Sequence, residues 1–136
     1  MTSPSVAALV GLIAWTLFLL VLMEALRCRL VLTKTIEANR FRPDNANLSP
    51  FMQRLARAHA NCIEGFPIFA GLLIVALLTQ KTGITDPLAL WLLAARLAQS
   101  CFHMASNSML FANARFAALV VQVVIAAFWC WSLLTG

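Results

Sequence analysis

The chain has 136 residues, of which 62% are hydrophobic and only 11% are charged, whereas a soluble domain carries about 25% charged residues. Ten basic and five acidic residues cannot cover the surface of a soluble fold, so the composition excludes a cytosolic globular enzyme, a disordered chain and a disulfide-stapled secreted module. The net charge of +5 lies mostly in one stretch between apolar segments. Nucleic-acid binding needs a soluble basic face with exposed aromatics, so no nucleic-acid partner is expected. The composition indicates a single domain, residues 1–136, that crosses the lipid bilayer several times.

The first apolar segment runs from Val6 to Met23 without a charged residue. With its flanks it forms a predicted span over about 6–30, long enough for the ~20 residues that one bilayer crossing requires. It lacks a basic leader and a small-residue cleavage site, so we interpret it as a retained helix and not as a signal peptide. Glu24 follows, and we expect it to pair with Arg27 or Arg29.

A polar connection centred on residues 37–50 leads to the second predicted span, at about 51–78. Ser49 precedes Pro50, a pair that is typical of a helix start, with serine as the cap and proline in the first turn. The first half of this span is polar and the second half is apolar. Pro67 lies inside it and predicts a bend.

The third and fourth spans are predicted at about 87–109, beginning at Pro87, and at about 111–134. Trp129 and Trp131 occupy positions typical of an interfacial aromatic belt. The fold class is therefore predicted as all-α, an integral membrane bundle of four helices.

The distribution of basic residues predicts how this multi-pass protein is oriented. Seven of the ten lie in or beside the first loop: Arg27, Arg29, Lys34, Arg40, Arg42, Arg54 and Arg57. The second loop holds only Lys81, and the two terminal segments hold none. By the positive-inside rule the first loop is cytoplasmic, and both termini lie on the opposite side.

Polar side chains within the predicted spans form three stripes at helical spacing. The stripe of the second span consists of Arg57, Asn61 and Glu64. That of the third span consists of Arg96, either Gln99 or Ser100, and His103. The fourth span contributes Arg115 and Gln122. One such stripe is explained by hydrogen bonds between helices. Three stripes that contain three arginines and one carboxylate favour an anionic ligand instead, since the guanidinium fork suits carboxylates and phosphates. A zwitterion with more than one carboxylate would also use Glu64.

The sequence does not favour a metal site. His59, Cys62, Cys101 and His103 are residues of types that bind zinc, but the two groups differ in depth and in helix face. The four cysteines, which are Cys28, Cys62, Cys101 and Cys130, are widely spaced. We expect them to act as small apolar side chains and expect no metal.

The segment Arg57-Ala58-His59-Ala60-Asn61-Cys62-Ile63-Glu64, followed by Pro67, resembles the R-A-H-x-N-x-x-E…P signature of the MAPEG family. This family comprises membrane-associated proteins in eicosanoid and glutathione metabolism. The four spans and the basic first loop resemble the family over essentially the whole chain. The resemblance implies a homotrimer that binds glutathione between neighbouring subunits, near the cytoplasmic side.

The resemblance also implies roles for individual residues. Arg57, Asn61 and Glu64 would hold the peptide portion of glutathione, and Arg115 would stabilise its thiolate. Arg96 would make a further contact with glutathione. Gln122 would make another, although it lies one residue away from the position of the glutathione-contacting glutamine in relatives. An arginine at the end of the first span would also contribute, with Arg29 as the first choice and Arg27 as the second. His103 stands where several relatives have tyrosine, so it either takes over that hydrogen bond or is an ordinary interfacial histidine.

Three hypotheses of function follow. The first is a glutathione transferase or peroxidase that acts on lipophilic small molecules arriving from the bilayer. The second is a non-catalytic protein that binds glutathione or lipid, because the chain contains no tyrosine; that lack also disfavours prostaglandin or leukotriene synthesis. The third is a small proton-coupled exporter, although the essential glutamate of such proteins usually lies in the first span, not at the position of Glu64.

Overall fold

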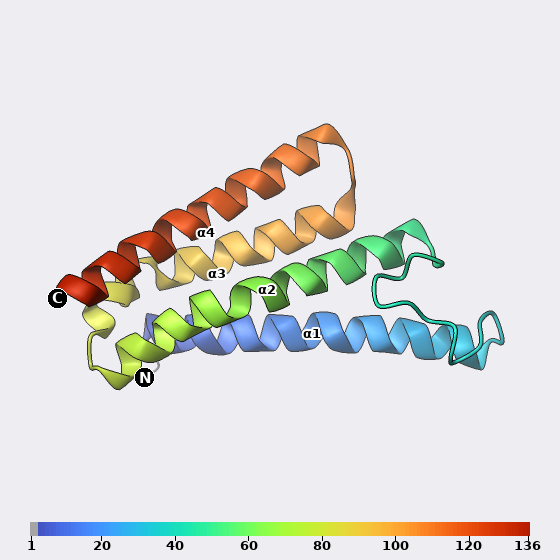
Figure 1. The fold of residues 1–136 in the computed structure, drawn as a ribbon, viewed down its shortest axis with the longest axis horizontal. Helices are drawn as coiled ribbons and strands as arrows, with labels where there is room; N and C mark the ends of the chain where they lie inside the picture. The colour runs from blue at the N-terminus through green and yellow to red at the C-terminus, as the bar shows by residue number, and fades with distance from the viewer. Residues whose placement is uncertain (1–2) are drawn as a thin grey trace.

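The computed structural model describes residues 3–136, and within this range it contains four long α-helices and no strand. They are α1 (Pro4–Leu32), α2 (Pro50–Leu78), α3 (Thr82–Ala105) and α4 (Met109–Thr135) (Figure 1). Each is long and apolar enough to cross a membrane. The predicted all-α membrane architecture is therefore confirmed, while residues 1 and 2 of the predicted domain lie outside the described part.

Serine caps explain where three of the helices begin. Ser3 Oγ accepts a hydrogen bond from the Val6 amide (3.2 Å) at α1, and Ser108 Oγ accepts one from the Phe111 amide (3.4 Å) at α4. Ser49 Oγ accepts from the Met52 amide (3.3 Å), with Pro50 as the first helical residue. The predicted start of the second helix is thus confirmed, and its physical reason is the capping that a serine–proline pair provides.

The third helix differs from its predicted bounds at both ends. It begins at Thr82, five residues before Pro87, so this proline lies inside the helix. Its fixed φ is compatible with a helix, but the helix lacks the hydrogen bond that an amide at residue 87 would make. It ends at Ala105, before the predicted residue 109, because Ser106 is extended at φ −167°. The α3–α4 connection is therefore the short segment 106–108.

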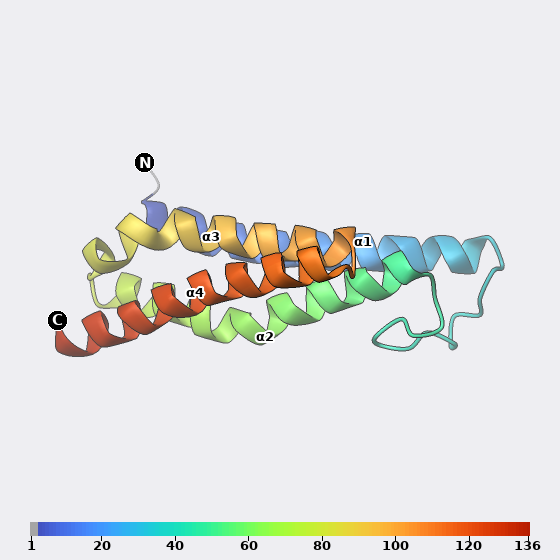
Figure 2. The ribbon, with the colours of Figure 1, turned by 90° about the horizontal axis from the view of Figure 1, so that it is seen from above.

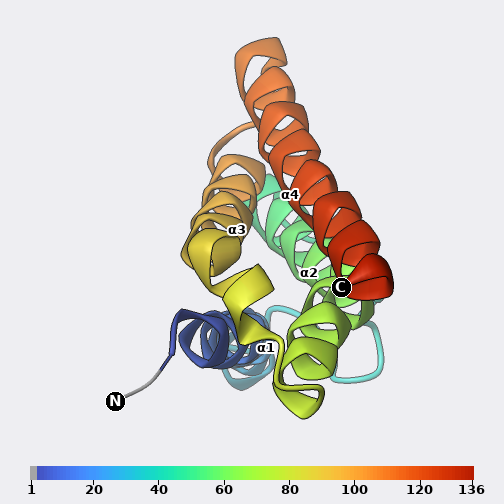
Figure 3. The same ribbon diagram turned by 90° about the vertical axis from the view of Figure 1, so that its left-hand side faces the viewer.

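The four helices run up and down along one long axis, with both termini at one end and the first loop at the other (Figures 1 and 2). Helix α3 packs against all three others, whereas α2 and α4 touch only slightly. Seen from the end, α4 leans away from α1 and α2 (Figure 3). Near the start of α4 the bundle is therefore less closed than at the opposite end.

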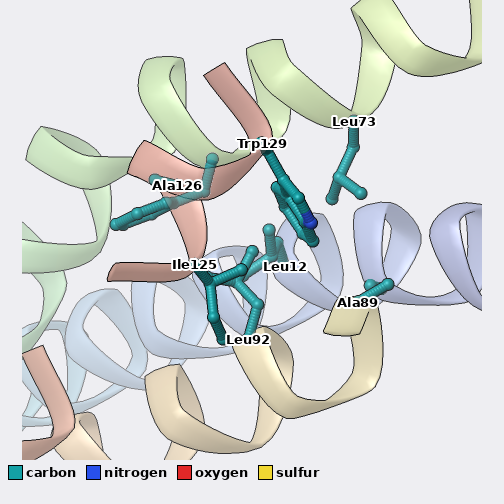
Figure 4. Close-up of a cluster of buried hydrophobic side chains, with 9 residues drawn as sticks. Leu12, Leu73, Ala89, Leu92, Ile125, Ala126 and Trp129 are labelled. Atoms are coloured by element: carbon teal, nitrogen blue, oxygen red, sulfur yellow. The ribbon is translucent and has the colours of Figure 1, made fainter. Parts of the chain in front are cut away.

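Two apolar clusters fill the interior. One lies toward the termini and contains Ala8, Leu12, Phe69, Leu73, Ala89, Leu92, Ile125, Ala126 and Trp129 (Figure 4). The other lies nearer the first loop and contains Leu19, Met23, Leu55, Ala56, Ala58 and Cys62. The prediction of an aromatic belt is wrong for Trp129, which is 0% exposed because it shares a helix face with Ile125 and Ala126. Trp131, two residues on, is 68% exposed.

At the termini a polar contact ties α1 to α3. The Ser5 amide donates to Asp86 Oδ1 (3.0 Å), and the Ser5 hydroxyl donates to the same oxygen (2.5 Å). The Thr85 hydroxyl lies 2.5 Å from Ser5 Oγ. This end of the bundle is held together by direct hydrogen bonds.

Candidate functional site

A chain of hydrogen bonds joins one residue from each of the three predicted polar stripes. The terminal amide of Asn61, on α2, lies 2.5 Å from His103 Nε2, on α3. Arg115 Nη1, on α4, lies 3.1 Å from His103 Nδ1. All three side chains are partly exposed. The helix packing thus brings together Asn61, His103 and Arg115, which are far apart in the sequence.

The chemistry of the partners fixes the protons in this chain of bonds. A guanidinium can only donate, so Nδ1 of His103 must be an unprotonated acceptor and the imidazole is neutral. Nε2 then carries the ring proton and faces the side-chain amide of Asn61, whose Nδ2 is the atom 2.5 Å away. A half-turn of this amide, which exchanges its nitrogen and oxygen, supplies the acceptor that the ring proton needs. Arg115 uses one of its donors on His103, and the others remain for a ligand.

Arg96, on α3, lies beside this chain of bonds. It is only 4% exposed, and its Nη1 lies 3.3 Å from the Asn61 carbonyl oxygen. Its guanidinium carbon is 5.4 Å from the centroid of the Phe69 ring, which is within cation–π range. A buried charge is costly unless it is paired. Among the described residues, the only ion pairs are Arg27–Glu24 and Arg40–Glu37, so Arg96 has no counter-ion within this subunit.

Gly65, on α2, makes room for Arg96. A Cβ atom at this position would lie 2.5 Å from Arg96 Nη2 and 2.7 Å from Phe69 Cε2. Only glycine allows the guanidinium to approach α2 so closely. Neither Gly65 nor Phe69 was predicted to belong to the site. An isolated glycine inside an apolar helix is the signal that points to such a close approach.

Replacing Gly65 with alanine is expected to lower thermal stability by forcing Arg96 and Phe69 apart. Overpacking of this kind costs about 1–3 kcal/mol. Gly71→Ala is the matched control, because it lies on the same helix and its Cβ would meet no atom within 4 Å. Thermal unfolding of the purified protein in mild detergent gives the melting temperatures of both variants. Equal melting temperatures for the two variants would contradict the close approach.

Arg57 and Glu64 form no hydrogen bond with Asn61, His103 or Arg115. Both are exposed on α2, and neither forms a hydrogen bond or ion pair with any residue in 3–136. Glu64 is at the midpoint of α2. An ionised group at membrane depth costs a few kcal/mol if it faces lipid. Arg57 and Glu64 are therefore charged groups of α2 that have no polar partner among the described residues.

Gln122 is placed differently from what the resemblance implied. It is 0% exposed, and its Nε2 donates to Gln99 Oε1 (2.8 Å) and to the Ala118 carbonyl oxygen (3.0 Å). Its own Oε1 is buried and has no partner among the described residues. A ligand would reach Gln122 only if α3 and α4 separated, so contact with glutathione stays a prediction.

The two candidate arginines of α1 also lie away from Asn61, His103 and Arg115. Arg27 donates to Glu24 Oε1 (3.1 Å), Asn45 Oδ1 (2.6 Å) and the Arg42 carbonyl oxygen (3.1 Å), so it anchors the first loop. The Arg27 alternative for the partner of Glu24 is thus confirmed. Arg29 is exposed and lines a separate cavity near the end of α1.

The cysteines divide into one buried and three exposed residues. Cys62 lies in the cluster nearer the first loop, with its Sγ 3.3 Å from Ser100 Oγ. The three exposed cysteines are Cys28, Cys101 and Cys130. His59 is half-buried on α2. Within residues 3–136 no three potential ligands of the His, Cys, Asp and Glu types lie close enough to hold a metal ion.

These observations define a membrane protein of four helices whose polar site is cationic and is shared by α2, α3 and α4. The chain belongs to the MAPEG family, since the model of that family matches residues 5–135, nearly the whole chain. The comparisons with curated proteins and with solved structures found no match. Family membership associates the chain with membrane proteins of glutathione or eicosanoid metabolism.

Proposed function

We propose that this protein is a glutathione-dependent membrane enzyme, of the transferase or peroxidase type, that acts on lipophilic electrophiles. The observation that carries the proposal is Arg115, a partly exposed guanidinium bonded to His103 that has no carboxylate partner among the described residues. The buried Arg96, beside the Asn61 carbonyl oxygen, adds a second positive charge that is equally without a carboxylate partner there. An anion completes such a site, and family membership favours glutathione as that anion.

Glutathione has two carboxylates, one ammonium group and one thiol. We assign its carboxylates to guanidinium groups, with Arg57 as the residue at the open surface, and its ammonium group to Glu64. Asn61 holds the peptide portion. The exposure of Arg57 and Glu64 supports this assignment, because both retain their hydrogen-bonding capacity for a ligand.

Arg115 is the residue we assign to catalysis. A cysteine-type thiol titrates near ~8.5, and only the thiolate is a good nucleophile. A fixed guanidinium beside the sulfur lowers the pKa of the bound thiol, and exclusion of water strengthens this attraction. The thiol loses its proton to water, and the thiolate forms a bond to the electrophilic atom, whose leaving group departs with its bonding electrons. His103 positions Arg115 through the bond to Nδ1.

The site is proposed to form at contacts between subunits of a homotrimer, because one subunit leaves Arg57 and Glu64 uncovered. The charge bias of the loops favours a position of the site near the cytoplasmic side. Native mass spectrometry in mild detergent is expected to give three times the mass of the chain, which is 14.9 kDa. Monomers alone, under conditions in which the protein remains folded, would contradict the shared site.

The activity itself is tested by conjugation of glutathione to a chromogenic aryl halide, followed by absorbance. Wild type is expected to turn over and Arg115→Ala is expected to lose most of that rate. No product across a broad panel of electrophiles, combined with stabilisation by glutathione, would instead identify a non-catalytic binding protein. Drug resistance or proton flux that is lost in Glu64→Gln would indicate the exporter.

A further inference from the structure

A cavity lies between the C-terminal end of α1, the first loop and the start of α2. Its volume is about 790 Å³. Its walls are mainly apolar and include Leu30, Ile36, Leu48 and Met52, while Arg29 provides the only charged side chain. None of Asn61, His103, Arg115 and Arg96 lines it. Within one subunit, this cavity therefore shares no residue with the group formed by Asn61, His103, Arg115 and Arg96.

The length of α1 places the cavity at the membrane surface. A helix of 29 residues is about 43 Å long at 1.5 Å per residue, whereas the hydrocarbon core is about 30 Å thick. The ends of α1 therefore reach the headgroup region. Arg29 lies in the last turn of α1, so its guanidinium is at the depth where phospholipid phosphates lie.

The charge of Arg29 is not balanced within the chain. No carboxylate of the described residues lies within 4 Å of it, and no acidic residue lines the cavity. Arg27, two residues earlier, already has Glu24 and Asn45 as partners. A cation at the edge of an apolar cavity is complementary to an anionic head joined to a hydrocarbon chain.

We propose that this cavity binds an anionic phospholipid of the leaflet that adjoins the first loop. The phosphate pairs with Arg29, and an acyl chain lies among Leu30, Ile36 and Met52. A lipid held there joins α1 and the first loop to the start of α2. This assigns Arg29 to lipid and not to glutathione, and it does not depend on the proposed enzymatic function.

The test is native mass spectrometry of the detergent-purified protein titrated with phosphatidylglycerol or with phosphatidylcholine of the same acyl chains. Wild type is expected to retain phosphatidylglycerol preferentially. Arg29→Ala should lower its retention about fivefold, as one basic residue near an anionic headgroup contributes ~1 kcal/mol. Lys34→Ala is the matched control, because it removes the same charge from the same region at a residue that does not line the cavity.

A second variant tests the apolar part of the cavity. Ile36→Trp fills the space without changing the charge, and it should lower retention of phosphatidylglycerol although Arg29 is intact. Gel filtration checks that both variants remain folded. Equal retention of the two lipids by wild type, or equal losses in Arg29→Ala and Lys34→Ala, would overturn the proposal in favour of diffuse attraction by the basic loop.

Discussion

Arg115→Ala is expected to lower kcat about a hundredfold, the usual effect of removing one donor that stabilises a developing or reactive anion. The rate should also rise with pH over a higher range than in wild type. Without the guanidinium, the pKa of bound glutathione returns toward the free thiol value of about 8.5, so less thiolate is present at neutral pH. A pH–rate profile with one electrophile measures both effects.

Two comparisons make this prediction specific to Arg115. Arg115→Lys should restore little of the rate, because an ammonium group cannot both donate to His103 Nδ1 and present a planar fork to the sulfur. His103→Phe should produce part of the Arg115→Ala loss, since it removes the acceptor that positions the guanidinium. An unchanged kcat and an unshifted profile for Arg115→Ala would exclude this residue from the mechanism.

Arg57→Ala is expected to act on binding instead of turnover. A charge-assisted contact to a carboxylate is made equally in the bound ground state and in the transition state, so its loss raises KM and leaves kcat nearly unchanged. Such bonds contribute about 1.5–3 kcal/mol, which corresponds to an increase in KM for glutathione of about ten- to a hundredfold. Steady-state kinetics with glutathione as the varied substrate give both constants.

The control for Arg57 is Arg40→Ala, which removes the same charge from the same basic stretch. Arg40 lies in the first loop, is strongly exposed, and pairs with Glu37 at 3.6 Å. Its loss should leave the KM for glutathione within about twofold of the wild-type value, because exposed ion pairs contribute little free energy. A similar rise in KM for both variants would mean that the basic stretch attracts glutathione only through its overall charge.

The parts of the fold that depend on local sequence were predictable. The four helices follow from long apolar runs, and the start of α2 follows from Ser49 and Pro50. Asn61, His103 and Arg115 were identified because a charged or amide group within a membrane span needs a partner. What could not be predicted is the rotation of each helix about its axis, which depends on packing between helices.

The rotation of a helix about its axis accounts for the prediction that was wrong and for the contacts that were not predicted. Trp129 shares a helix face with Gln122 and Ile125, and this face turns into the bundle, so tryptophan becomes core instead of interfacial anchor. The same rotation buries Gln122 against Gln99. The role of Gly65 depends on the approach of Arg96 from another helix. No pattern within one helix contains this information.

The central claim is that glutathione binds to the cationic site, and thermal unfolding with and without glutathione tests it most directly. A ligand that binds only the folded state stabilises it by about 2.7 kcal/mol at a hundred times its dissociation constant. Reduced glutathione is therefore expected to raise the melting temperature of wild type until the site is saturated. Arg57→Ala should need a glutathione concentration about ten- to a hundredfold higher for the same shift in melting temperature. No shift at millimolar glutathione in folded wild-type protein, whether reduced or oxidised, would contradict the account.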